Sequence, residues 1–116
     1  MSISVTVYRV VFWSLLTVVA IVSLIAIPAS QPQLFIWQDK LYHGLAYGTL
    51  FALLVKAYGA RYRLWHLAVS LALFGLVVEI AQFFTGYRQL EVWDFIANSL
   101  GIFLVCLIAV TLTAKR

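Results

Sequence analysis

Residues 64–84 read LWHLAVSLALFGLVVEIAQFF, and Glu79 is the one residue with a full charge in that stretch. A helix rises about 1.5 Å per residue, so a helix of this length covers the roughly 30 Å of hydrocarbon in a bilayer. An apolar run of this length is typical of a membrane span and too long for the usual core helix of a soluble domain. The stretch therefore predicts a transmembrane helix.

Three further apolar segments have a similar length, at about 8–27, 41–58 and 92–113. The connections between the four segments are short, so neighbouring helices must run antiparallel. The first segment is longer than the roughly 7–15 residues of a signal-peptide core, and we expect it to remain as a span. The sequence predicts an all-α membrane protein, with residues 1–116 forming one antiparallel bundle of four transmembrane helices.

The composition agrees with a chain that lies in lipid. Apolar residues make up 65% of the sequence, charged residues 10%, and the mean hydropathy is +1.03. A soluble domain carries about 25% charged residues, so this composition excludes a soluble enzyme. The single cysteine, Cys106, excludes a disulfide framework and a cysteine-rich metal site.

The basic residues predict the orientation of the bundle. Lys40 and Arg88 lie on one side of the predicted spans, and six basic residues lie on the other: Arg9, Lys56, Arg61, Arg63, Lys115 and Arg116. Short loops rich in Lys and Arg stay in the cytoplasm. We therefore expect both termini to be cytoplasmic.

Polar residues gather in the outer half of the predicted bundle. This half contains all four acids, Asp39, Glu79, Glu91 and Asp94, and also Lys40, His43, Gln82, Arg88 and Asn98. An ionisable group facing lipid at this depth costs roughly 2.5–3.5 kcal/mol or more. We expect these side chains to face the bundle interior and one another.

The spacing of these residues supports their convergence. Asp39, His43 and Tyr47 share one face of the second predicted helix, Glu79 and Gln82 one face of the third, and Asp94, Asn98 and Gly101 one face of the fourth. Gly44, Gly48 and Ala52 form a stripe of small residues that either permits close helix approach or is ordinary membrane-helix packing. We expect one polar cavity that opens to the outer leaflet.

Three blocks of sequence resemble the VanZ-like family of small bacterial membrane proteins. They are Asp39-Lys40-x-x-His43-x-x-x-Tyr47, then Glu79-x-x-Gln82, then Arg88-x5-Asp94-x-x-x-Asn98-x-x-Gly101. The resemblance covers residues 39 to 101, and the first span fits in placement but not in motif. Glu91 departs from the family pattern, which has a small hydroxyl residue near that position.

The resemblance implies a multi-pass protein of the bacterial inner membrane. The family is named for a member associated with resistance to the glycopeptide teicoplanin. By remote resemblance it is grouped with membrane enzymes that exchange or remove phosphate-linked lipid head groups, such as base-exchange phosphatidylserine synthases. The expected partners are therefore membrane lipids or lipid-linked envelope precursors rather than nucleic acid, and a homo-oligomer is compatible with this.

The polar residues supply what phosphodiester cleavage or exchange requires. Cations are needed to neutralise developing charge, and Lys40 and Arg88 are the candidates. His43, oriented by Asp39, is the candidate general base, and Glu79 the candidate acid. Asp94 would orient the acceptor or join Asp39 and Glu79 around a divalent cation. The predicted binding residues are completed by three side chains: Gln82, Asn98 and Tyr47.

Each of these residues also has a structural interpretation. Asp39 and Lys40 would be an interfacial cap and a snorkelling charge, and Arg88 would pair with Asp94 or Glu91. Gln82 and Asn98 would be hydrogen bonds between helices. The competing functional class is a non-catalytic protein that binds a lipid or amphiphile, or a small transporter. A transporter is expected to have polar groups along the whole path and repeat symmetry, and this sequence shows neither.

Overall fold

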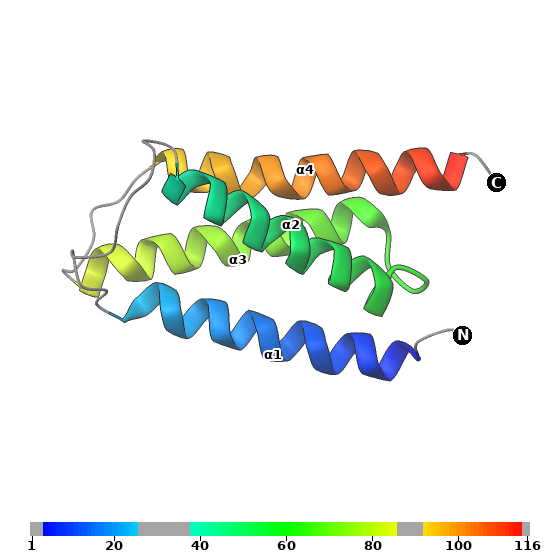
Figure 1. Ribbon diagram of the computed structural model, residues 1–116, viewed down its shortest axis with the longest axis horizontal. Coiled ribbons are helices and arrows are strands. Elements are labelled where there is room, and N and C mark those ends of the chain that lie inside the picture. The colour runs from blue at the N-terminus through cyan, green and yellow to red at the C-terminus, as the bar shows by residue number, and fades with distance from the viewer. Residues whose placement is uncertain (1–3, 26–37, 86–91, 115–116) are drawn as a thin grey trace.

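The computed structural model describes residues 4–25, 38–85 and 92–114, with Asp39, Thr113 and Ala114 described by backbone alone (Figure 1). This part of the chain is helical and contains no strand. The helices are α1 (Val5–Leu24), α2 (Gln38–Tyr58), α3 (Leu64–Thr85) and α4 (Val92–Ala114). The predicted all-helical fold is confirmed.

The four helices run antiparallel to their neighbours in chain order, so that α1 begins and α4 ends at the same end of the bundle (Figure 1). We name this the α1-start end, and the other end, where α3 ends and α4 begins, the α4-start end. Helix α2 packs most extensively against α4 and next against α1. It is the central helix of the contact network.

Three helices are long and apolar enough to cross a membrane: α1, α3 and the Val92–Leu112 part of α4. Helix α2 has a similar length of 21 residues, but its first turn contains Gln38, Asp39 and Lys40, and His43 follows. These residues lower its hydropathy at the α4-start end. The predicted fourth span therefore stays a prediction.

The helix boundaries differ from the predicted spans mainly at α1 and α2. Helix α1 begins at Val5, three residues before the predicted start, because the Ser4 hydroxyl accepts a hydrogen bond from Val7 N at 3.4 Å and caps the first turn. It ends at Leu24, and the last predicted residues, 26 and 27, lie outside the described part. Helix α2 begins at Gln38, which brings Lys40 onto the helix.

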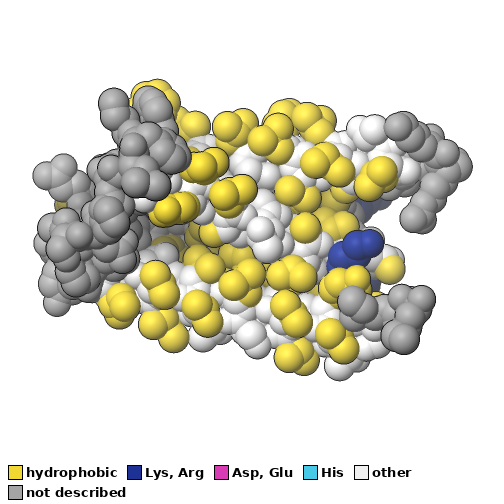
Figure 2. Space-filling view, viewed as in Figure 1, with side chains coloured by type: hydrophobic (Ala, Val, Ile, Leu, Met, Phe, Trp, Pro, Cys, Tyr) yellow, Lys and Arg dark blue, Asp and Glu magenta, His cyan; other side chains and the backbone are white. Residues whose placement is uncertain are grey.

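The interior is apolar and centred on α2. Leu50 and Phe51 are fully buried, and they pack in one cluster with Phe12 of α1, Leu71 of α3 and Ile102 of α4. The outside is apolar as well: Val77 is 63% exposed and Phe84 78% exposed. Figure 2 shows hydrophobic side chains spread over the described part of this face, with Lys and Arg visible only near the α1-start end. A surface of this kind suits lipid rather than water.

At the α1-start end, aromatic and basic side chains join α1 to α2. Arg9 donates from Nε to the carbonyl oxygen of Ala57 at 3.1 Å, and its guanidinium lies 4.5 Å from the centre of the Tyr58 ring. Trp13 donates from its indole nitrogen to the Tyr58 hydroxyl at 2.9 Å. Arg9 thereby satisfies one of the carbonyls that the end of α2 leaves without an intrahelical donor.

Helices α2 and α4 approach through glycine. A Cβ built on Gly101 would collide with the carbonyl oxygen of Gly44, whereas a Cβ built on Gly44 would lie 3.5 Å from the carbonyl oxygen of Ala97. The small-residue stripe predicted from Gly44 and Gly48 does face α4, while Ala52 is exposed.

This asymmetry predicts opposite outcomes for the same substitution. Gly101→Ala is expected to lower the free energy of unfolding by roughly 1–3 kcal/mol, because backbone rather than a side chain must move. Gly44→Ala makes only an ordinary contact and gains helix propensity, so it should be neutral or stabilising. Thermal unfolding of both variants in the same detergent measures the difference. Equal melting temperatures would contradict the close approach of α2 and α4.

Candidate functional site

Polar side chains of α2 and α4 meet at the α4-start end of the bundle. Lys40 Nζ lies 2.6 Å from Asp94 Oδ1, with the lysine side chain 20% exposed and the aspartate 2% exposed. At this distance the ammonium and the carboxylate form a salt bridge. The pair joins the first turns of two helices.

The position of Asp94 in its helix favours a carboxylate. Asp94 lies in the first turn of α4, where the helix dipole and the unpaired N–H groups stabilise negative charge. Lys40 lies in the first turn of α2, where the same dipole disfavours a cation. The ion pair with Asp94 offsets that disadvantage and neutralises both charges at the bundle interior.

His43, one turn after Lys40, lies between two side chains of α4. Its Nδ1 is 3.1 Å from Asn98 Oδ1, an amide oxygen that accepts the hydrogen bond from Nδ1 in the tautomer protonated there, and its Nε2 is 3.8 Å from Asp94 Oδ2. When Nδ1 carries the proton and donates to Asn98, Nε2 holds the lone pair and faces the carboxylate. A proton accepted at Nε2 would be stabilised by Asp94.

Helix α3 joins this group through Gly75. A Cβ on Gly75 would lie 3.0 Å from Tyr47 Cε2 and 3.2 Å from Asn98 Nδ2, so the glycine leaves room for both side chains. Tyr47 is 3% exposed and within electrostatic reach of Glu79, which is also 3% exposed. Glu79 is thus buried in the bundle near Tyr47, on the helix that meets Asn98 at Gly75.

Gln82 is also buried, but its described hydrogen bond is to the backbone of α1 rather than to another polar side chain. Its Nε2 donates to the carbonyl oxygen of Ser23 at 2.7 Å, which satisfies a carbonyl in the last turn of α1. Its Oε1 accepts no hydrogen bond from the described residues. The hydrogen bond of the amide nitrogen agrees with a structural role for Gln82 between two helices. The amide oxygen is a buried acceptor for which no donor is described.

Some of the predicted site residues cannot be placed. Arg88 and the Asp39 side chain, which we expect to orient His43, lie outside the described residues, and so does Glu91, to which the sequence assigns no site role. The partners of His43 that the structure describes, Asp94 and Asn98, come from α4. Among the described side chains, no three of His, Cys, Asp or Glu lie close enough to hold a metal ion.

The structure brings together six of the predicted site residues. We name them the polar cluster: Lys40, His43, Tyr47, Glu79, Asp94 and Asn98. Together they provide a cation at the edge, an imidazole between an amide and a carboxylate, and a buried second carboxylate. These groups are suited to bind an anion and to transfer a proton beside it.

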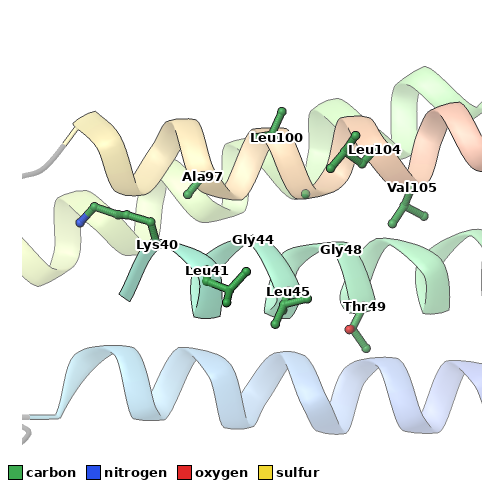
Figure 3. A pocket seen from close by; sticks show the side chains of 11 residues that line it. Lys40, Leu41, Gly44, Leu45, Gly48, Thr49, Ala97, Leu100, Leu104 and Val105 are labelled. Atoms are coloured by element: carbon green, nitrogen blue, oxygen red, sulfur yellow. The ribbon is translucent and has the colours of Figure 1, made fainter. Parts of the chain in front are cut away.

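Three features of this region were not predicted from the sequence. Gly75 lies four residues before Glu79 on the same helix face, a spacing that offered a signal. The contact with the carbonyl oxygen of Ser23 has no signal in the sequence, because every residue has a backbone carbonyl. The third feature is a groove of about 560 Å³ between α2 and α4, with Lys40 at one end (Figure 3).

No protein family model, curated protein or solved structure matches this chain. Its function is therefore argued from the chemistry of the polar cluster and from the motif resemblance.

Proposed function

We propose that the chain is a VanZ-like membrane protein that acts on phosphate-containing head groups of lipids or lipid-linked envelope intermediates at the outer leaflet. The observation that carries the proposal is His43, held at Nδ1 by Asn98 and facing Asp94 at Nε2. A partly buried imidazole between an amide and a carboxylate is an arrangement suited to proton transfer. The proposed reaction class is head-group transfer or phosphodiester cleavage.

In this proposal Lys40 attracts the phosphate and His43 takes the proton of the incoming alcohol, amine or water. Asp94 stabilises the imidazolium that forms, and Glu79 protonates the leaving oxygen. Arg88 keeps its sequence-based role as a second phosphate contact. The partial exposure of the Lys40 side chain supports access from the α4-start end.

The second candidate is a non-catalytic protein that binds the same head groups. Its support is the ion pair between Lys40 and Asp94. A bound phosphate would compete with Asp94 for Lys40, and this binding requires no chemical step. Comparison of envelope lipids and lipid-linked glycans in cells with and without the protein separates the two. A changed head group supports the enzyme, and retention of an unchanged lipid on the purified protein supports the binder.

The proposal also fixes the topology: four spans, both termini in the cytoplasm, and the polar cluster near the outer leaflet. The basic residues Arg9, Lys56, Arg61 and Arg63 support this orientation. Single cysteines at positions 30, 59 and 86, on a background with Cys106→Ser, would be treated with an impermeant thiol reagent in intact cells. Labelling is expected at positions 30 and 86 and only after lysis at position 59, and the reverse pattern would overturn the orientation.

A further inference from the structure

We infer that the groove between α2 and α4 holds a hydrocarbon chain of the lipid whose phosphate head group lies at Lys40. The inference rests on the proposed function and extends it from the head group to the tail. It commits to one occupant, a membrane lipid with an anionic phosphate head group. Three features of the groove support this occupant: its apolar lining, the cation at one end and its continuity with the polar cluster.

The lining of the groove is almost entirely apolar. Its rims are leucines of both helices, Leu41 and Leu45 on α2 and Leu100 and Leu104 on α4, and small residues lie between the rims. Figure 3 shows these side chains along facing stretches of α2 and α4. The volume of about 560 Å³ lies within the roughly 300–1,000 Å³ of ligand pockets.

The two ends of the groove differ in charge. Lys40 lines one end, and Thr49, Leu104 and Val105 line the part further along the helices. A groove with a cation at one end and hydrocarbon along its length is complementary to an amphiphile with an anionic head. The tail moves from the hydrocarbon of the bilayer to the apolar wall of the groove, so the groove supplies packing while Lys40 supplies the preference for an anionic head.

Lys40 connects the groove to the polar cluster. The same side chain lines the groove and lies 2.6 Å from Asp94, which in turn faces His43. A lipid seated in the groove would therefore carry its phosphate to the side of the cluster where proton transfer is proposed. This continuity distinguishes the groove from the other lipid-facing surfaces of the bundle.

The test uses the purified full chain in phosphatidylcholine nanodiscs. The probes are phosphatidic acid with a photoactivatable diazirine on one acyl chain, and diacylglycerol with the same labelled chain. Mass spectrometry then maps the crosslinks. We expect labels concentrated on groove residues such as Leu45 and Leu104, with phosphatidic acid favoured about fivefold, the ratio that one lysine near the surface gives an anionic lipid.

Leu45→Trp and Leu104→Trp fill the groove from its rims. Both leucines are more than half exposed, so the bundle should fold. Leu73→Trp on α3 is the matched control, since Leu73 is 55% exposed and does not line the groove. We expect the rim variants to lose the concentrated labelling and the control to retain it.

Labels spread over all lipid-facing surfaces in proportion to their exposure would overturn the inference, as would equal labelling by the two probes. A groove that stays unlabelled while other lipid-facing surfaces are labelled would also overturn it. Because this readout needs no turnover, a groove that binds lipid beside an inactive cluster would refute the enzyme while the tail site stands. Activity without groove labelling would do the opposite.

Discussion

Changing His43 to Gln or Glu79 to Gln is expected to lower the rate of the proposed head-group reaction by about 10²- to 10⁴-fold, the usual contribution of one proton-transfer partner. Glutamine keeps much of the shape and the hydrogen-bonding capacity of both side chains but does not gain or lose a proton near neutral pH. His43 is hydrogen-bonded to Asn98, and Glu79 is buried, so both substitutions should preserve the packing. The expected loss is one of chemistry rather than folding.

The measurement is the lipid or head-group change that the wild-type protein causes, normalised to the amount of folded protein in the membrane. His66→Gln is the matched control. His66 is exposed on α3 and stacks on Trp65 with ring centres 3.8 Å apart, away from the polar cluster, so the same substitution should leave the activity unchanged.

The double change His43→Phe with Glu79→Leu sharpens the test. Apolar replacement of buried ionisable groups is often neutral or stabilising when both are replaced. A purely structural pair would therefore tolerate it and retain function, whereas an active site would fold and be inactive. A fall smaller than about tenfold in both glutamine variants would contradict proton transfer and favour the binding protein.

Spacing along one helix predicted that Glu79 and Gln82 share the inward face of α3, and both are buried. Leu67, Leu71, Gly75, Glu79 and Gln82 are all buried on α3, as a helical repeat with one interior face requires. The cost of placing a charge in lipid then predicted that Glu79 and Asp94 lie inside, and both are buried. Burial of these residues thus followed from local pattern and solvation alone.

The partners across helices could not be predicted in this way. Asp39, four residues before His43, stays a predicted partner because its side chain lies outside the described residues, and the partners that the structure describes are Asp94 and Asn98 of α4. Which residues of two helices meet depends on how far one helix is shifted along the axis of the other, and here the close approach of Gly44 and Gly101 sets that shift. Sequence spacing within a helix carries no information on the shift.

Lys40→Met is expected to lower the free energy of unfolding by about 3–5 kcal/mol, the cost of breaking a buried ion pair by removing one partner. The reason is the position of Asp94, which is 2% exposed and has its Oδ1 2.6 Å from Lys40 Nζ. Without the lysine, the carboxylate loses its cation in a place that water hardly reaches. The bundle is then expected to unfold at a lower concentration of a denaturing detergent. Circular dichroism during titration with that detergent measures the change.

Lys56→Met is the matched control for that change. Lys56 is exposed in the last turn of the same helix, so its loss should change stability by no more than about 0.5 kcal/mol. The double variant Lys40→Met with Asp94→Leu removes both charges together and should recover most of the stability lost in the single variant. A cost below about 1 kcal/mol for Lys40→Met alone would mean that water reaches Asp94 and that the pair behaves as a surface ion pair. Recovery of stability without recovery of function in the double variant would instead show that the charges serve the reaction, because the bundle itself would then be folded without them.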